Sequence, residues 1–236
     1  MTINGVDIST MGAVQHHVDI GHAEVKNGST WVNAAMLPHF ENGYLGFKQI
    51  DIDFLVRGAS REDIINKRGQ LLSQFVAPVD LVLDGFTHRF KVAMKSHKED
   101  EMIMRRTHKV SVSLLGYEYG TEVIATGTSR ISTSNPGTLV SPVRLEITPN
   151  ANASNVTITG LVRNPQTGAD IPVKIGSMTK SKVITLDGAN GLFTEDGALK
   201  PDIDIQHPPG VAPGAVTVTC SSPTAIMAMS ILPLYM

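Results

Sequence analysis

The stretch Phe47-Lys-Gln-Ile-Asp-Ile-Asp-Phe-Leu-Val-Arg57 decides the fold of the first half of the chain. Its apolar residues Ile50, Ile52, Phe54 and Val56 alternate with polar ones, broken only by Leu55, and this period of two predicts a β-strand. Side chains on a strand point to its two faces in turn, so the apolar set shares one face. The stretch is therefore predicted to be a strand with one face in a core and the other in water.

A capped helix is predicted directly after this strand. Ser60-Arg-Glu-Asp63 resembles a capping box, in which the hydroxyl and the carboxylate satisfy backbone N–H groups at the helix start. Ile64, Leu71 and Phe75 then fall on one side of the helix, which is expected to end before Pro78.

Three further strands are predicted after the helix, the first two joined by a hairpin turn. Asp84-Gly85 lies between the alternating runs 79–83 and 86–94, and Asp-Gly is a strong signal for a two-residue hairpin turn. The charged residues from Lys95 to Glu101 are expected to form a tip, followed by a long strand from Met102 to Leu115. Because these strands are long and polar on one face, we expect the sheet to contact something other than its own core.

This order of elements, closed by Leu115-Gly-Tyr-Glu-Tyr119, resembles the N-terminal domain of the distal tail protein (Dit) of siphophages. In the second half, Ser141–Thr148, Val156–Gly160, Val183–Gly188 and Leu232–Tyr235 resemble the galectin-like β-sandwich that follows in the same family. The likeness extends over nearly the whole chain. It rests on the order of elements and on short phrases rather than on a single motif.

The resemblance implies a structural virion protein at the tip of a phage tail, assembled in the host cytoplasm. Such a protein forms a hexameric ring that joins the tail tube protein to the tail-tip hub, the fibre protein or the receptor-binding apparatus. Its lumen lets DNA pass without specific binding. The implied fold is mostly β with one helix, divided into a ring-forming domain over residues 1–131 and a galectin-like sandwich over 141–236. The polar, Pro- and Gly-containing segment Ser132–Val140 is the expected linker.

Composition limits the function classes independently of the resemblance. Of the 236 residues, 42% are hydrophobic and 18% are charged, which argues against a disordered chain. The formal net charge of −2 and the pI near 6.4 argue against a protein that holds nucleic acid through its phosphates. No run approaches the ~20 apolar residues of a membrane helix, so no membrane insertion is expected. Cys220 is the single cysteine, so no disulfide within the chain can form.

Motifs of enzyme chemistry are lacking: the sequence has no Gly-rich phosphate loop, no zinc-protease motif, no paired cysteines and no nucleophile elbow. Two kinds of polar group have ligand chemistry for a cation, namely aspartates two residues apart and a histidine group (Asp51 and Asp53, Asp202 and Asp204, His16, His17 and His22). Neither has further ligands at a suitable spacing, so solvated polar surfaces are expected. We predict no catalytic, cofactor-binding or metal-binding residue and no enzyme activity.

Contacts between subunits are expected along the first strand, at the hairpin and in the basic run 105–109. The candidate interface residues are Ile50, Ile52, Phe54, Asp84, Gly85 and Arg105. A ring needs contacts that join one surface to a different one, and long strands with exposed edges can provide them.

The alternative function is a carbohydrate-binding module that recognises a host cell-wall glycan through the C-terminal sandwich. Sugar sites usually offer an aromatic ring to the apolar side of the sugar, and after the linker the chain has only Phe193 and Tyr235. Phe193, in the predicted loop 191–197, is therefore the candidate glycan contact.

Overall fold

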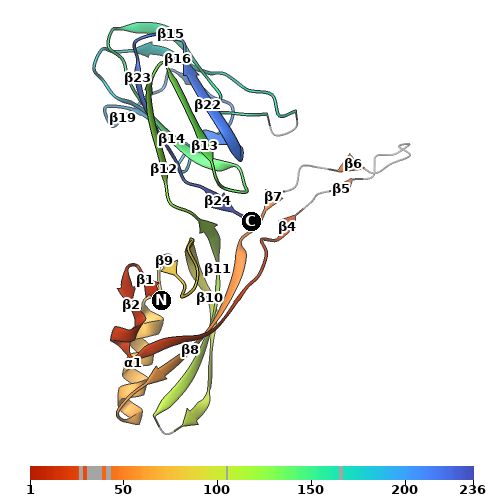
Figure 1. The fold of residues 1–236 in the computed structure, drawn as a ribbon, viewed down its shortest axis with the longest axis vertical. Helices are drawn as coiled ribbons and strands as arrows, with labels where there is room; N and C mark the ends of the chain where they lie inside the picture. The colour runs from red at the N-terminus through yellow and green to blue at the C-terminus, as the bar shows by residue number, and fades with distance from the viewer. Residues whose placement is uncertain (27–28, 31–38, 41–43, 105, 165–166) are drawn as a thin grey trace. The chain divides into compact units, whose positions relative to one another are not determined.

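The computed structural model describes residues 1–26, 29–30, 39–40, 44–104, 106–164 and 167–236. They form two compact units, residues 1–119 with Met236, and residues 120–235. Strands make up almost all of the regular structure, and α1 (Arg61–Ser73) is the one α-helix in the part of the chain described (Figure 1). The predicted mostly-β fold with one helix is thus confirmed. The helices described are all too short or too polar to span a lipid bilayer.

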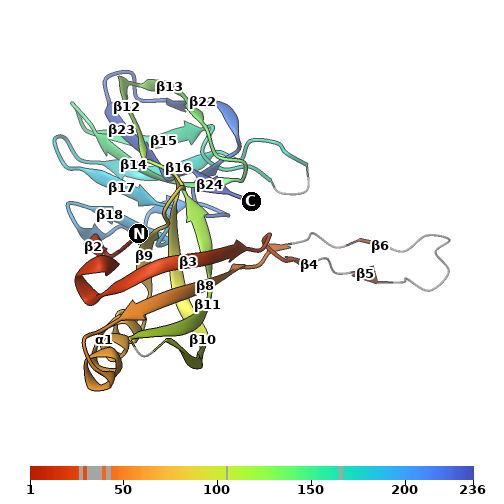
Figure 2. The same cartoon turned by 60° about the horizontal axis from the view of Figure 1, so that its bottom comes forward.

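The N-terminal unit is built on one antiparallel sheet. Its strand order is β2 (Val6–Asp7), β1 (Thr2–Ile3), β9 (Val79–Val82), β10 (Arg89–Met104), β11 (Thr107–Tyr119), β8 (Lys48–Arg57) and β3 (Ala13–Ile20). Figure 2 shows β3, β8, β11 and β10 side by side.

Shorter elements connect the strands of this unit. A 3-10 helix, η1 (Ile8–Met11), precedes β3. Two short ladders join β3 to β8, in which β4 (Val25–Lys26) pairs with β7 (Tyr44–Leu45), and β5 (Ser29–Thr30) pairs with β6 (His39–Phe40).

The predicted alternation in β8 is confirmed by its burial. Ile50, Ile52, Phe54 and Val56 are at most 1% exposed and pack in a core with Leu71 of α1 and with Phe75, just beyond the helix. The rings of Phe54 and Phe75 lie 6.2 Å apart. The helix begins as predicted, because the Ser60 hydroxyl accepts a hydrogen bond of 3.1 Å from the backbone N–H of Asp63.

The charged segment from Lys95 to Glu101 is not a tip but part of β10, which runs unbroken to Met104. β10 pairs with β11 along this length, with register shifts between Met94 and Ser96, between Glu99 and Met102, and between Met102 and Met104. Hydrophobic periodicity misses this part of the strand because polar residues there need no core to form a backbone ladder.

The Asp84-Gly85 turn is also different from the two-residue hairpin predicted. Gly85 has φ +84°, whereas Asp84 has a negative φ, and Phe86 N–H donates a 3.3 Å hydrogen bond to Leu83 C=O. One positive φ at the third position is typical of a type II turn rather than the mirror-image type. The connection runs from Val82 to Arg89, because its length is set by where β9 and β10 pair.

The C-terminal unit is a sandwich of two antiparallel sheets. The first has the order β12 (Val123–Thr128), β23 (Ile226–Ile231), β14 (Ser141–Thr148), β17 (Ile184–Asp187), β18 (Leu192–Glu195) and β19 (Ala198–Leu199). The second has the order β13 (Arg130–Asn135), β22 (Gly214–Cys220), β15 (Ala153–Thr159), β16 (Val173–Met178) and β20 (Ile203–Asp204). β21 (Gly210–Val211), which pairs with β14, and β24 (Leu234–Tyr235) are the remaining strands described.

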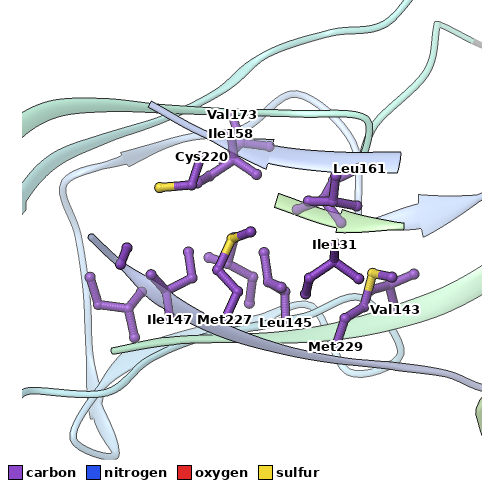
Figure 3. Close-up of a cluster of buried hydrophobic side chains, with 14 of the residues drawn as sticks. Ile131, Val143, Leu145, Ile147, Ile158, Leu161, Val173, Cys220, Met227 and Met229 are labelled. Carbon is purple, nitrogen blue, oxygen red and sulfur yellow. The ribbon is translucent and has the colours of Figure 1, made fainter. Parts of the chain in front are cut away.

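Apolar side chains from the two sheets meet in the middle of the sandwich. Figure 3 shows Leu145 and Met227 from one sheet facing Ile158 and Cys220 from the other, and all four are at most 6% exposed. Burial raises the pKa of the Cys220 thiol, which keeps it protonated and unreactive.

The two compact units divide between Tyr119 and Gly120, earlier than the expected domains 1–131 and 141–236. The expected linker begins inside β13, which pairs with β22 along its whole length. Asn135, 2% exposed, donates a 3.0 Å hydrogen bond to the Val211 carbonyl, which fixes the end of the strand in the sandwich. The sequence of β13 is rich in Ser and Thr, like a linker, because β13 is an edge strand with one face in water.

A pair of glycine substitutions separates backbone strain from crowding. A Cβ built on Gly85 or Gly69 has no neighbour within 4 Å, but only Gly85 has a positive φ. Gly85→Ala should lower the free energy of unfolding by about 1–2 kcal/mol through strain. Gly69→Ala, in the exposed middle of α1, should raise it by up to about 1 kcal/mol. Urea unfolding of both variants measures the difference, and equal effects of the two substitutions would contradict this account.

Candidate assembly surface

Two long strands of the N-terminal sheet have an open edge. β3 pairs with β8 along Ala13–Ile20 and has no partner on its other side among the residues that the structure describes. β9 covers the outer edge of β10 only from Phe90 to Val92, so the rest of β10 has no strand beside that edge within the described ranges. The backbone N–H and C=O groups along these two edges are therefore available to another strand.

The two open edges belong to strands that run in opposite directions. β3, β8, β11 and β10 are consecutive in the sheet, and every neighbouring pair is antiparallel. Because there are four of them, β10 runs opposite to β3. If a second copy keeps the same orientation, its β3 can lie beside β10 of the first copy as an antiparallel strand. The sheet can therefore continue from copy to copy without turning a subunit over.

The face of these strands away from α1, here called the outward face, carries paired charges. Lys109 on β11 lies 2.9 Å from the Asp53 carboxylate on β8, and the Ser111 hydroxyl donates a 2.6 Å hydrogen bond to the same group. Partial burial opposes ionisation of Asp53, but the hydrogen bonds and charge from Ser111 and Lys109 outweigh it and lower the pKa of Asp53.

A second charged network lies on the outward face near the start of β10. Lys91 contacts Asp80 at 3.0 Å, and the Tyr119 hydroxyl donates a 2.7 Å hydrogen bond to the same carboxylate. Burial, followed by the hydrogen bond to Asp80, raises the pKa of Tyr119 to about 12. Asp80 is itself held ionised, because these partners offset its burial and lower its pKa. Both networks join different strands, so they fix the outward face in one arrangement.

A buried ion pair occupies the opposite face at one end of the sheet. Lys48, 5% exposed, pairs with Glu118, and the His88 imidazole lies 2.6 Å from the other oxygen of that carboxylate. Burial raises the pKa of Glu118, but hydrogen bonds from Lys48 and His88 outweigh it, so the net shift is downward. Without this carboxylate the buried lysine would be an unpaired charge, so loss of either partner is expected to destabilise the unit strongly.

The candidate interface residues on β8 lie in the core. Ile50, Ile52 and Phe54 are 0%, 1% and 0% exposed, so their side chains are not available to a neighbouring subunit. The physical reason is the alternation that predicted the strand: the apolar face is buried by the subunit's own helix. On the outward face of the same strand, Asp51 and Asp53 take their place.

The other candidate interface residues fall in different surroundings. Asp84 is exposed and pairs with the amino group of Met1, and its backbone N–H donates a 3.0 Å hydrogen bond to Gln15. Gly85 lies beside it at the exposed turn. Arg105 lies outside the described residues.

The candidate glycan contact lies on a strand rather than in a loop. Phe193 belongs to β18, where it is partly buried and packs against the core of the sandwich. Only part of its ring is therefore offered to a ligand. In the ranges that the structure describes, no three His, Cys, Asp or Glu side chains are grouped so as to hold a metal ion.

Sequence reasoning missed the residues along the open edges. Asp19 on β3, and Ser96 and Lys98 on β10, lie on the outward face, opposite Asp51, Ser113 and Ser111 respectively in the strand register. The alternating run 86–94 is the only part of β10 that the sequence pattern indicates. The strand itself is 16 residues long and continues beyond this run to Met104. Which strand ends up at an edge depends on pairing between distant segments, and no local pattern shows that.

Acid should unfold the protein through its paired carboxylates. The pKa values of Asp53, Asp80 and Glu118 are lowered in the folded state, so the stability they contribute is present above their unfolded values of 3.8 and 4.5 and is lost as pH falls through the folded values. Asp53→Asn should cost about 1–2 kcal/mol at neutral pH and make the loss on acidification shallower. Urea unfolding from about pH 7 to pH 3 tests this, and parallel curves for the variant and the unmodified protein would refute it.

Comparison with solved structures finds proteins of phage tails. The SPP1 Dit protein, described as a paradigm of the hub adsorption apparatus in phages infecting Gram-positive hosts, matches with a TM-score of 0.74 at 13% identity, over 97% of this chain and 96% of that one. The phage P2 baseplate in its activated conformation with Ca matches with a TM-score of 0.53 at 9% identity, over 95% of this chain and 92% of that one.

The same baseplate with Sr gives a TM-score of 0.50 at 9% identity, with the same shares of the two chains. No protein-family model and no curated protein matches the sequence. Identities this low show the fold alone. The chain therefore has the fold of phage tail hub and baseplate proteins, and the resemblance to the distal tail family that its sequence indicates is confirmed at the level of the fold.

Proposed function

We propose that this protein is a structural, non-enzymatic component of a phage tail tip. Its N-terminal unit assembles head to tail into a closed hexameric ring that joins the tail tube protein to the tail-tip hub or fibre protein. DNA passes through the lumen without specific binding. The protein is assembled in the host cytoplasm and resides in the virion.

The observation that carries this proposal is the pair of open, oppositely directed edges on one sheet. Contacts between two different surfaces of identical subunits generate either a ring or an open filament. The edges of β3 and β10 are two such surfaces, and their antiparallel relation allows the sheet to continue between copies. The likeness to hub and baseplate proteins supports the closed form, and the number six comes from the resemblance to the distal tail family.

The side chains on the two edges suit contact between copies. On the outward face, β10 presents Lys98 while β3 presents Asp19. Across the sheet Asp19 lies in the row of Ser96, two residues from Lys98, so a joint shifted by two residues brings the opposite charges together. On the inward face, Val18 and Ile20 of β3 and Met94 of β10 are partly buried against the core. Pairing therefore continues the polar layer on the outward face and, beside Met94, the apolar layer on the inward face, where His97 follows on β10.

The charge balance suits a passage for DNA. Lys109 and Lys91 on the outward face are each bound to an aspartate, and the chain carries a formal net charge of −2. A lumen with many unpaired lysines and arginines would hold phosphates by releasing counterions, and would retain the DNA. In this scheme the C-terminal sandwich docks other proteins of the tail tip.

The mass of the particle in solution tests the proposal. Multi-angle light scattering at micromolar concentration should give six copies of the 25.3 kDa chain, or twelve if two rings stack. A monodisperse monomer at every salt and protein concentration would contradict it.

Charge reversal at the edge should weaken the ring. Asp19→Lys places a cation against Lys98 of the next copy, so the ring should dissociate at a protein concentration at least about tenfold higher than for the unmodified protein. Asp51→Lys is the matched control, because it makes the same change on the same face one strand further in.

The double variant Asp19→Lys with Lys98→Asp restores opposite charges across the joint and should recover much of the assembly. Light scattering over a dilution series measures all three variants. An equal effect of the edge substitution and its control would refute pairing through β3.

A further inference from the structure

A pocket lined mainly by polar residues opens on the outer face of the second sandwich sheet, the sheet that does not contain Phe193. Three neighbouring segments line it: β15, β16 and the segment that contains β20. The side chains and the glycine that matter for its chemistry are Asn155, Thr157, Lys174, Gly176, Asp202 and Asp204.

Asp202 is held in position by groups behind the pocket. The Ser177 hydroxyl donates a 2.6 Å hydrogen bond to one carboxylate oxygen, and the Lys200 ammonium lies 3.0 Å from the other. Lys200 is nearly buried, with a side chain 5% exposed, and Glu195 contacts it at 3.2 Å. The hydrogen bonds from Ser177 and Lys200 lower the pKa of Asp202 and keep it ionised. A carboxylate fixed in this way presents its charge at the pocket with little freedom to move.

The backbone of β16 also helps to position Asp202. Gly176 donates its N–H to the Asp202 carbonyl at 2.8 Å. A Cβ at position 176 would lie 3.0 Å from the Asp202 carboxylate, so a side chain there would push the carboxylate away. Glycine at this position keeps the carboxylate close over the strand.

Asn155 enters the pocket from a strained backbone. It has φ +54° between Ser154 and Val156, in the middle of β15. A residue other than glycine pays about 1 kcal/mol or more for this conformation, and strain of this kind is concentrated at binding sites. Within the part of the chain that the structure describes, the side chains of Asn155, Lys174 and Asp204 make no hydrogen bond to the protein. Their polar groups are exposed and available to a ligand.

We propose that this pocket binds a neutral or amino-bearing saccharide. Each sugar hydroxyl both donates and accepts a hydrogen bond, and the pocket offers carboxylate acceptors from Asp202 and Asp204 beside donors from Lys174 and Asn155. Two aspartates and one lysine give the lining a net negative charge, which disfavours phosphates and acidic sugars. The ammonium groups of Lys174 and Lys200 disfavour a bare metal ion at the same place.

Saturation-transfer NMR on the full chain tests the pocket with trisaccharides of glucose, N-acetylglucosamine and glucosamine, and with inorganic phosphate as the anionic probe. Without an aromatic platform the affinity is expected to be about millimolar, which this method detects. At least one trisaccharide should bind and phosphate should not. Asp204→Asn and Lys174→Gln should each weaken saccharide binding about tenfold, because each removes a charged hydrogen bond.

Asn155→Gly separates a binding role from a purely structural one. Its matched control is Ser181→Gly, an exposed residue with φ +63° outside the pocket. Both substitutions exchange strain for a more flexible unfolded chain, so both should move the melting temperature alike and by little. Only Asn155→Gly should weaken saccharide binding.

Three results would overturn the proposal: no trisaccharide binds the unmodified protein, phosphate alone binds, or the pocket variants bind as well as the Ser181→Gly control. The particle mass, measured on the same samples, reports on the ring. A failure of the saccharide site is thus distinguished from a failure of assembly.

Discussion

The N-terminal unit depends on the burial of one face of its sheet beneath α1. Val56 and Phe54 on β8 and Val110 on β11 point to the same side, and Phe75, just beyond the helix, closes over them. Burial of such side chains contributes about 1.5–3 kcal/mol each, more than the exposed ion pairs on the other face can contribute. Because this face is satisfied within one subunit, the contact proposed between copies uses the strand edges and the polar face.

Several charged groups of the N-terminal sheet are tied into pairs that join separate strands. Lys109 bridges β11 to Asp53 on β8, Lys91 joins β10 to Asp80 on β9, and Lys48 is buried against Glu118. Such pairs add little stability at the surface, but they favour one register of the sheet over others. A ring closes only if each subunit presents its edges at the same angle, so a sheet with a fixed register is suited to repeated head-to-tail contact.

The sandwich combines an apolar interior with a polar outer face. Its core joins the two sheets through apolar side chains such as Leu145 and Ile158, and the other face of β15 and β16 points to solvent. Lys200 is a buried charged residue of this unit, bound by Glu195 and Asp202 at the margin of a pocket. Burying an ammonium group costs free energy because the group loses its water. Here the ion pair with Lys200 also holds the carboxylate of Asp202, which faces solvent, in one position.

The sequence by itself determined the features that depend on neighbours along the chain. The period of two in residues 50–56 predicted both the strand and its buried face, and Ser60 predicted the helix start. The order of these elements was sufficient to indicate the distal tail family. These predictions succeed because backbone capping and the alternation of side chains are short-range effects.

Only the tertiary structure decided which surfaces remain open. Ile50 was assigned to the subunit contact because alternation shows that a face is buried without showing what buries it. Ser132–Asn135 has the composition of a linker but belongs to an edge strand. Residues 95–104 extend β10, although no hydrophobic alternation in the sequence marks them as a strand. Asn155, Lys174 and Asp202 form one pocket only because β15, β16 and the segment before β20 lie side by side. Pairing of this kind joins segments far apart in the chain, and its energy comes from contacts that no local pattern contains.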